Sequence, residues 1–103
     1  MSDEQKRYLV TIDEEALVMM DNHLDFLSNV SMEAAEKLAN QLTKGMASLE
    51  FMPQRCPAYR TIQTAGNYRR LILGRYQIIF SINEASGTVK VKYILDSRQN
   101  SEF

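Results

Sequence analysis

The chain has 103 residues, 45% of them hydrophobic, with four glycines and two prolines, and its net charge is −1. These values predict one globular domain over residues 1–103 and exclude a disordered chain, and without an apolar run near 18 residues we expect no membrane span. One cysteine, Cys56, and one histidine, His23, exclude an internal disulfide and argue against a metal site. Because the N-terminus also lacks a signal-peptide pattern, we expect a cytoplasmic protein. We also expect no cofactor.

The first half of the chain predicts a strand followed by two helices. Residues 1–6 are polar and expected to be frayed, and Tyr8–Ile12 alternates as a strand does, with Tyr8, Val10 and Ile12 on one face. Asp13 is expected to cap the first helix, which ends near Asn29, and Ser31 to cap the second, which Pro53 stops. The buried stripes are Ala16, Leu17, Met20, Leu24 and Leu27 in the first helix, and Ala35, Leu38, Leu42, Met46 and Leu49 in the second. Gly45 costs about 1 kcal/mol in a helix interior, and a close crossing would explain it.

The second half predicts a loop and three strands. Residues 53–66 have no periodicity, apart from a short extended piece at Tyr59–Ile62. Tyr68–Leu73 and Tyr76–Ile82 flank Gly74-Arg75, which suits a type II′ hairpin, and a turn at 83–87 leads into Thr88–Leu95. A polar tail follows, frayed over residues 100–103. We therefore expect an α+β fold, ordered β-α-α-β-β-β, in which a helical hairpin covers one face of an antiparallel sheet of about four strands.

Charge is unevenly divided along the chain. Residues 1–52 hold four bases against ten acids, a balance of −6, whereas residues 53–103 hold eight bases against three acids, a balance of +5. Such a separation can steer an anionic partner, or it can reflect only the different compositions of helices and strands. Adjacent Arg69 and Arg70 must point to opposite faces of their strand, so we expect one of them to meet the helical layer, where carboxylates can pair with it.

The ordered motifs of the chain resemble those of the RelE/ParE superfamily of toxins from bacterial type II toxin–antitoxin systems. The matching pieces are Tyr8–Ala16, Ser31–Ala35, Leu49 with Pro53, Tyr59-Arg60, Tyr68–Tyr76 and Tyr93–Gln99. The resemblance covers about residues 7–99 and is closer to ParE-like members, often labelled plasmid stabilisation proteins, than to RelE. It implies a growth-arresting toxin that a cognate antitoxin silences.

The superfamily implies two different activities. RelE-like members cut messenger RNA on the ribosome, whereas ParE-like members poison DNA gyrase by contact. A metal-independent endoribonuclease needs a general acid, a general base and cations. Its candidates here are Arg69, Arg75, Tyr93 and Arg98.

The residues of the chain favour contact over cleavage. His23 is expected to be a helix-face residue near the core, and Tyr93 a core aromatic, because it alternates with Val89 and Val91. Gln77 stands where RelE-like nucleases carry an arginine. Cys56 is expected to be an inert loop thiol.

We therefore favour a ParE-like protein that acts on DNA gyrase and is not an enzyme. The candidate partner-binding residues are Arg60, Arg70, Arg75 and Arg98. A RelE-like ribosome-dependent endoribonuclease, and a non-toxic homologue that acts as a binding protein, stay open as alternatives. The sequence also leaves the oligomeric state open, a homodimer included.

Overall fold

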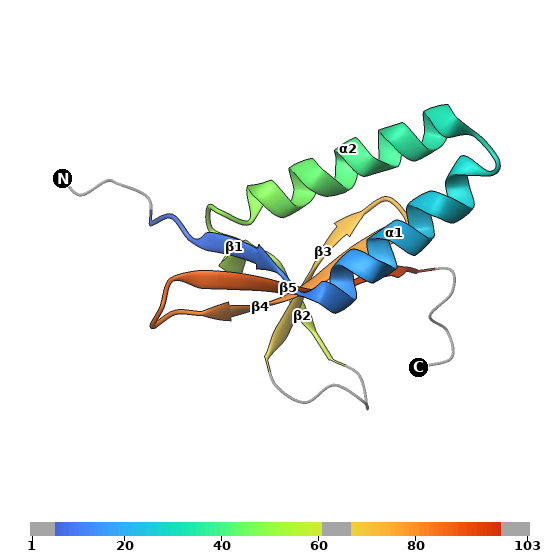
Figure 1. Cartoon of the computed structure of the whole chain (residues 1–103). Helices are drawn as coiled ribbons and strands as arrows, with labels where there is room; N and C mark the ends of the chain where they lie inside the picture. The colour runs from blue at the N-terminus through green and yellow to red at the C-terminus, as the bar shows by residue number, and fades with distance from the viewer. Residues whose placement is uncertain (1–5, 61–66, 98–103) are drawn as a thin grey trace.

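Two amphipathic helices and a strand meander give this chain an α+β fold. The computed structural model describes residues 6–60 and 67–97. Along the chain the elements are β1 (Leu9–Ile12), α1 (Glu14–Ser28), α2 (Met32–Ser48), the 3-10 turn η1 (Pro53–Arg55), β2 (Ala58–Tyr59), β3 (Tyr68–Leu73), β4 (Tyr76–Asn83) and β5 (Thr88–Asp96). Both α-helices lie on the same side of the sheet (Figure 1). Neither of these helices is long and apolar enough to cross a membrane.

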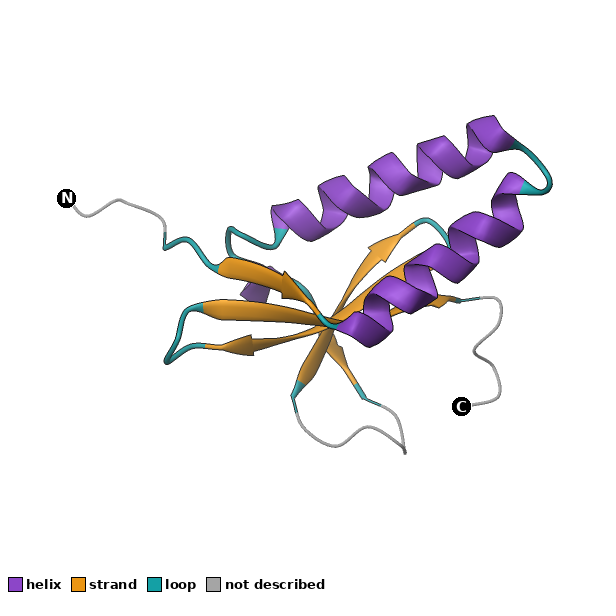
Figure 2. Cartoon of the chain, viewed as in Figure 1, coloured by secondary structure: helices purple, strands orange, loops and turns teal. Residues whose placement is uncertain are grey.

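The sheet has five strands in the order β1-β5-β4-β3-β2, with β1 parallel to β5 and all other pairs antiparallel. The predicted meander, with the first strand at its edge, is confirmed, and the helical hairpin covers one face as expected (Figure 2). The expected count of about four strands was one too low, because Ala58 and Tyr59 pair with Arg69 and Tyr68 as a short edge strand. Residues 61–62 of the predicted extended piece lie outside the described residues, as do residues 1–5 and 98–103. Lys6, the last residue of the segment expected to be frayed, is described, and its Nζ lies 3.7 Å from a carboxylate oxygen of Glu84.

The central hairpin forms where the sequence predicts it. Gly74 has φ +62°, and Arg75 does not share the positive φ, which fits a type II′ turn and not a type I′ turn. β4 and β5 each run one residue beyond the predicted boundary, to Asn83 and Asp96. The hairpin therefore sets the register of the whole sheet, because β4 lies at its centre.

Helix α2 matches its predicted cap and buried stripe, but it ends at Ser48 and not at Pro53, which begins η1. The side chain of Ser31 accepts a hydrogen bond from the backbone N–H of Ala34 at 3.1 Å, and the predicted stripe is buried. Gly45 allows a close approach to the sheet: a Cβ atom there would lie 2.5 Å from Cδ1 of Leu73 and 3.3 Å from Cδ1 of Ile78. Glycine at this position lowers helix propensity, but it leaves the space that α2 needs to pack on the hairpin.

Helix α1 differs from its prediction at two positions. Leu17 is 45% exposed, whereas Met19 packs against the core, because the helix meets β5 on the side where Ala16 and Met19 lie. Asp13 stands at the N-cap, but its side chain makes no capping bond. That carboxylate accepts a 3.0 Å hydrogen bond from Lys92 instead, and so ties the start of α1 to β5.

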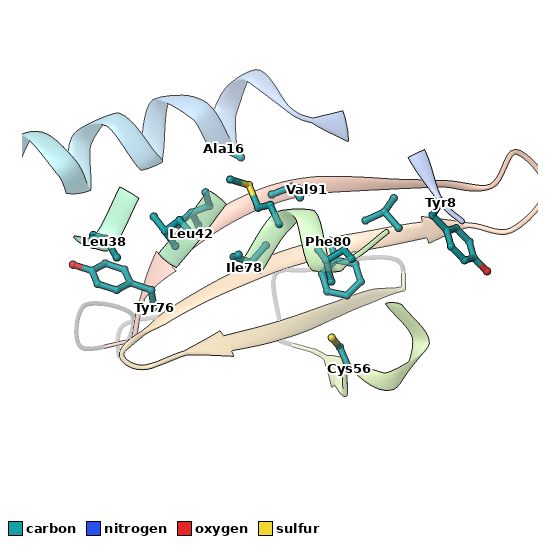
Figure 3. Close-up of a cluster of buried hydrophobic side chains, with 13 residues drawn as sticks. Tyr8, Ala16, Leu38, Leu42, Cys56, Tyr76, Ile78, Phe80 and Val91 are labelled. Carbon is teal, nitrogen blue, oxygen red and sulfur yellow. The ribbon is translucent and has the colours of Figure 1, made fainter. Parts of the chain in front are cut away.

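The hydrophobic core fills the space between the helices and the sheet (Figure 3). Leu42 of α2, Ile78 and Phe80 of β4 and Val91 of β5 are completely buried there. Tyr8 and Tyr76 lie at opposite ends of the cluster and are 5% and 8% exposed. Burying such side chains is worth about 1.5–3 kcal/mol each, and this fixes which face of every strand points toward the helices.

An irregularity in β5 overturns the prediction for Tyr93. Phe80 pairs with Val91 and Ile79 pairs with Tyr93, so Lys92 is an extra residue in β5. A bulge of this kind reverses the alternation that follows it. Val89 and Val91 point to the core as expected, but beyond the bulge Ile94 is the buried residue and Tyr93 is only half-buried.

Candidate functional site

The side of the sheet opposite the helices is the candidate site, and we call it the open face. Pairing places its residues in rows: Tyr59 beside Tyr68; Arg70 beside Ile79 and Tyr93; Ile72 beside Gln77 and Leu95; and Ser81 beside Lys90. Residues paired across a sheet share a face, and the neighbours of these residues along each strand point to the core. The open face therefore combines tyrosines, two cations and aliphatic side chains.

The open face has a small packed floor of its own. Ile79 is completely buried and Gln77 is 6% exposed, although neither belongs to the core under the helices. Ile79 lies between Arg70 and Tyr93 in the pairing, and the rings of Tyr68 and Tyr93 are 6.5 Å apart. These flanking side chains shield Ile79, so their positions are held by packing and not left free in solvent.

Arg70 projects onto this face with unmet hydrogen-bonding capacity. Its Nε atom is buried and, within the described part of the chain, has no hydrogen-bond partner. One Nη group donates to Oε1 of Gln77 at 3.5 Å, which is a weak contact. Gln77 accepts from Arg70 on this face, at the position where a nuclease of the superfamily would place an arginine of its own.

Arg69 points the other way and holds the loop before β2. Its Nη1 atom donates to the backbone oxygen of Cys56 at 2.6 Å and to that of Gln54 at 3.2 Å. The two arginines are therefore split across the sheet as predicted, but the expected pairing with helical carboxylates is wrong, since the acceptors are carbonyls. Cys56 itself is buried, and burial raises the pKa of its thiol, so the thiol stays protonated at neutral pH.

The other predicted arginines lie apart from Arg70. Arg60 is exposed, and it lines a cavity of about 250 Å³ together with Arg69 and Glu84. Arg75 occupies the hairpin turn, with its guanidinium 5.8 Å from the ring centre of Tyr76. Arg98 lies outside the described residues. The three described members of the candidate partner-binding set thus occupy different parts of the fold.

The described members of the candidate nuclease set do not converge either. Arg69 and Tyr93 are on opposite faces of the sheet, and Arg75 is in the turn at the end of the hairpin. His23 matches the prediction of a helix-face residue: its Nε2 donates to the backbone oxygen of Ile94 at 2.8 Å, and its ring meets Tyr76 edge-on at 5.3 Å. No general acid and base face each other across one phosphate-sized space among these candidates.

Sequence reasoning missed Tyr59, Tyr68 and Lys90 as site residues, and it placed the candidate Tyr93 in the core. Tyr59 and Tyr68 share a side with Arg70, and alternation along β3 alone places Tyr68 there. Tyr93 joins them only because of the bulge at Lys92. A signal in the sequence for that bulge is not evident.

The charge asymmetry of the sequence becomes an asymmetry between layers. Helices α1 and α2 expose six carboxylates, those of Glu14, Glu15, Asp21, Asp25, Glu33 and Glu36, against Lys37 and Lys44. The positions assigned to the open face hold Arg70 and Lys90 and no acid. Just after β1, Asp13 accepts a hydrogen bond from Lys92, and this bond lowers the pKa of the Asp13 carboxyl.

Glu84 is held at the far rim of the sheet. Its carboxylate accepts hydrogen bonds from the Tyr8 hydroxyl at 2.7 Å and from the Gln54 amide at 2.9 Å. The bond from Gln54, followed by that from Tyr8, lowers the pKa of Glu84. This acid is thus already satisfied, and it ties β1 and η1 to the turn after β4.

Comparison with known families identifies the fold. A family model described as the ParE toxin of the type II toxin–antitoxin system, parDE, matches residues 10–101. Among solved structures, a chain of the chromosomal ParDE system from P. aeruginosa is similar, with a TM-score of 0.69 and 14% identity, over 86% of this chain and 95% of that one. No curated protein matches the chain.

Two RelBE complexes share the fold as well. One is the toxin–antitoxin complex RelBE2 from Mycobacterium tuberculosis, with a TM-score of 0.61 and 15% identity, over 92% of this chain and 97% of that one. The other is the archaeal RelE–RelB complex from Pyrococcus horikoshii, with a TM-score of 0.58 and 15% identity, over 90% of this chain and 98% of that one. At such identities the likeness shows the fold alone.

Proposed function

The chain belongs to the family of ParE toxins of type II toxin–antitoxin systems, and we propose that it arrests growth by binding DNA gyrase and that a cognate antitoxin neutralises it. The gyrase target and the neutralising antitoxin are the two parts of this proposal that go beyond family membership. Family membership supports a toxin, and the similar solved chains come from toxin–antitoxin systems. The proposed location is the cytoplasm, where gyrase acts.

One observation favours contact over RNA cleavage: the dispersal of the candidate catalytic residues. Arg69, the central cation of the nuclease alternative, has its Nη1 atom engaged by the carbonyls of Cys56 and Gln54. Tyr93 is on the opposite side of the sheet, and Gln77 is buried beside Arg70. A phosphorane formed near Tyr93 would therefore have Arg70 and Lys90 as its cations, with no paired acid and base.

The helical layer offers a surface that suits an antitoxin. A shallow groove of about 430 Å³ runs between α1 and α2, and its lining includes Leu24, Met32 and Ala35 beside Asp21 and Asp25. Antitoxins of this class wrap a helix and an extended segment over the toxin. A helix with an apolar stripe and basic flanks fits a groove of this composition. The edge strand β1 leaves one side open to an extended segment.

The experiment that tests the proposed function measures both superfamily activities. Purified chain is added to a gyrase supercoiling assay and, in parallel, to a translating extract in which message cleavage is followed. We expect inhibition of supercoiling at micromolar protein and intact messages. Cleaved messages without gyrase inhibition would replace the proposal by the ribosome-dependent nuclease. Harmless expression together with neither effect would favour a non-toxic binding protein.

The antitoxin is tested separately, by genetics and then by binding. The small open reading frame next to the gene is co-expressed with the chain, and growth is compared with expression of the chain alone. We expect growth to be restored and the two proteins to co-purify. If the neighbouring product neither binds nor rescues, the antitoxin part of the proposal is wrong.

A further inference from the structure

We propose that the open face docks a protein segment that presents a carboxylate flanked by apolar side chains, and that the toxin engages its target through this segment. The assignment of the segment to the target rests on the function proposed above. The surface itself consists of the open-face residues defined earlier, with Arg70 and Lys90 as its cations. Its occupant is deduced from hydrogen bonding, charge and exposed apolar area.

The guanidinium of Arg70 is the first reason to expect a carboxylate. An arginine side chain has five N–H donors, and in the described residues one Nη group of Arg70 has a weak bond to Gln77, while its Nε has no partner. A partly buried cation with so few acceptors is poorly compensated. A carboxylate that approaches from solvent can accept from the Nη groups in a forked geometry and supply the missing charge.

The charge around Arg70 leads to the same conclusion. Lys90 is exposed on the same face, where it pairs with Ser81 in the row next to that of Arg70. Lys92, the next cation, is already occupied by Asp13 at 3.0 Å. Because six exposed carboxylates lie on the helical layer, the field of the molecule favours the arrival of an anionic segment at the open face.

The rest of the face suits apolar side chains. Ile72 is 54% exposed beside buried Gln77, and Tyr59, Tyr68 and Tyr93 are half-buried, so each presents part of its ring. Tyrosine and arginine are the residues most enriched where interfaces hold most of their binding energy. No α-helix of the described residues covers this face, because both helices lie on the opposite side of the sheet (Figure 1).

A protein segment fits this face better than single-stranded nucleic acid does. Affinity for nucleic acid comes largely from phosphates neutralised by several lysines and arginines. Among residues 6–60 and 67–97, the open face offers only Arg70 and Lys90 for that purpose, since Lys92 is paired. Ile72 and Leu95 would lie against a charged backbone, whereas they match the apolar flanks of a peptide.

The test compares one double variant of the open face with one control on the helical layer. In a double variant of the open face, Lys90→Glu reverses one charge and Ile72→Ser removes the most exposed aliphatic side chain of the face without adding a charge; both residues are exposed, so folding should survive. Lys44→Glu makes the same charge change on α2 and is the matched control. Urea unfolding of the double variant, the control and wild type checks that stability is unchanged. The readouts are inhibition of gyrase supercoiling and growth arrest.

We expect the double variant Lys90→Glu/Ile72→Ser to need at least 10-fold more protein for half-inhibition of gyrase, and Lys44→Glu to need less than 2-fold more. If wild-type chain inhibits gyrase and the folded double variant is equally potent, the inference is overturned while the proposed function stands. If wild-type chain does not inhibit gyrase, the proposed function fails, and the inference is then decided by direct binding.

Direct binding uses labelled protein and two defined probes. A synthetic dodecapeptide of alternating glutamate and leucine, and a dodecamer of deoxythymidine, are titrated into ¹⁵N-labelled chain while amide shifts are recorded. We expect the peptide to shift amides of Arg70, Ile79 and Tyr93, and Lys90→Glu to weaken its binding at least 5-fold. Binding of the oligonucleotide alone would make the face a nucleic-acid surface. Peptide shifts confined to the helices, or no shifts at all, would overturn the inference.

Discussion

Replacing Arg69 by alanine tests whether this residue is a structural clamp or a functional cation. Its Nη1 atom donates to the carbonyl of Cys56 at 2.6 Å, in a half-buried setting, and to the more exposed carbonyl of Gln54 at 3.2 Å. Hydrogen bonds from charged donors are worth about 1.5–3 kcal/mol when the acceptor is left unsatisfied, and water can replace the outer one. We therefore expect Arg69→Ala to lower the free energy of unfolding by about 2 kcal/mol.

The assay for this prediction is urea unfolding followed by far-UV circular dichroism. With a urea dependence of about 2 kcal/mol per molar for a chain of this size, the midpoint should fall by about 1 M. Arg60→Ala is the matched control: Arg60 is an exposed arginine that lines the same cavity, and its replacement should change stability by less than about 0.5 kcal/mol. Growth arrest by Arg69→Ala should fall only as far as its folded fraction falls.

The result that would refute this reasoning is a separation of stability from activity. If Arg69→Ala unfolds at the same urea concentration as wild type and yet no longer arrests growth, Arg69 acts on a partner or a substrate. The nuclease alternative would then regain its central cation. Such a result would also mean that the loop at residues 53–56 is held by its other contacts.

Three further outcomes follow from the packing and the charges. Gly45→Val should lose about 1–3 kcal/mol of stability in thermal unfolding, because its Cβ would lie 2.5 Å from Leu73, whereas Gly45→Ala should lose less, since Leu73 can move its methyl group and alanine favours the helix. Ser31→Ala should cost about 1 kcal/mol by the same measurement, because it removes the cap of α2, and an unchanged melting temperature would contradict that role. The bond from Lys92 lowers the pKa of Asp13 below its ordinary value of 3.8, so the pair stabilises the fold above that pH and the stability is lost as pH falls through the folded pKa. In urea titrations, the difference between wild type and Lys92→Met should therefore shrink as pH is lowered below 3.8, and a constant difference would show that the pair does not act through charge.

Most of the fold could be predicted from the sequence because its signals are local. Helix α2 combines a capping serine with a stripe at three- and four-residue spacing, and every predicted stripe residue is buried, although the helix ends at Ser48 and not at the predicted Pro53. The hairpin depends on Gly74, whose positive φ is a property of a single residue. These elements needed no knowledge of what they pack against.

The candidate site was only partly predictable, because its composition depends on pairing between distant strands. Alternation showed that Arg69 and Arg70 point to opposite sides, but not which one meets the helices; packing of Leu71 and Leu73 under α2 decides that. Leu17 was wrongly assigned to the core for a similar reason. The sequence of a helix is compatible with several choices of buried face, and contact with β5 selects one of them.

The sequence by itself thus determined the α+β class, the order of the elements, the hairpin and the opposed charges of the two halves. Only the tertiary structure turned that charge difference into an acidic helical layer and a cationic open face. It also moved Tyr93 out of the core, because one extra residue in β5 at Lys92 reverses the alternation after it. Hydrophobic periodicity can be read from the sequence, whereas the register of a strand is set by the strand that pairs with it. The composition of the open face depends on that register.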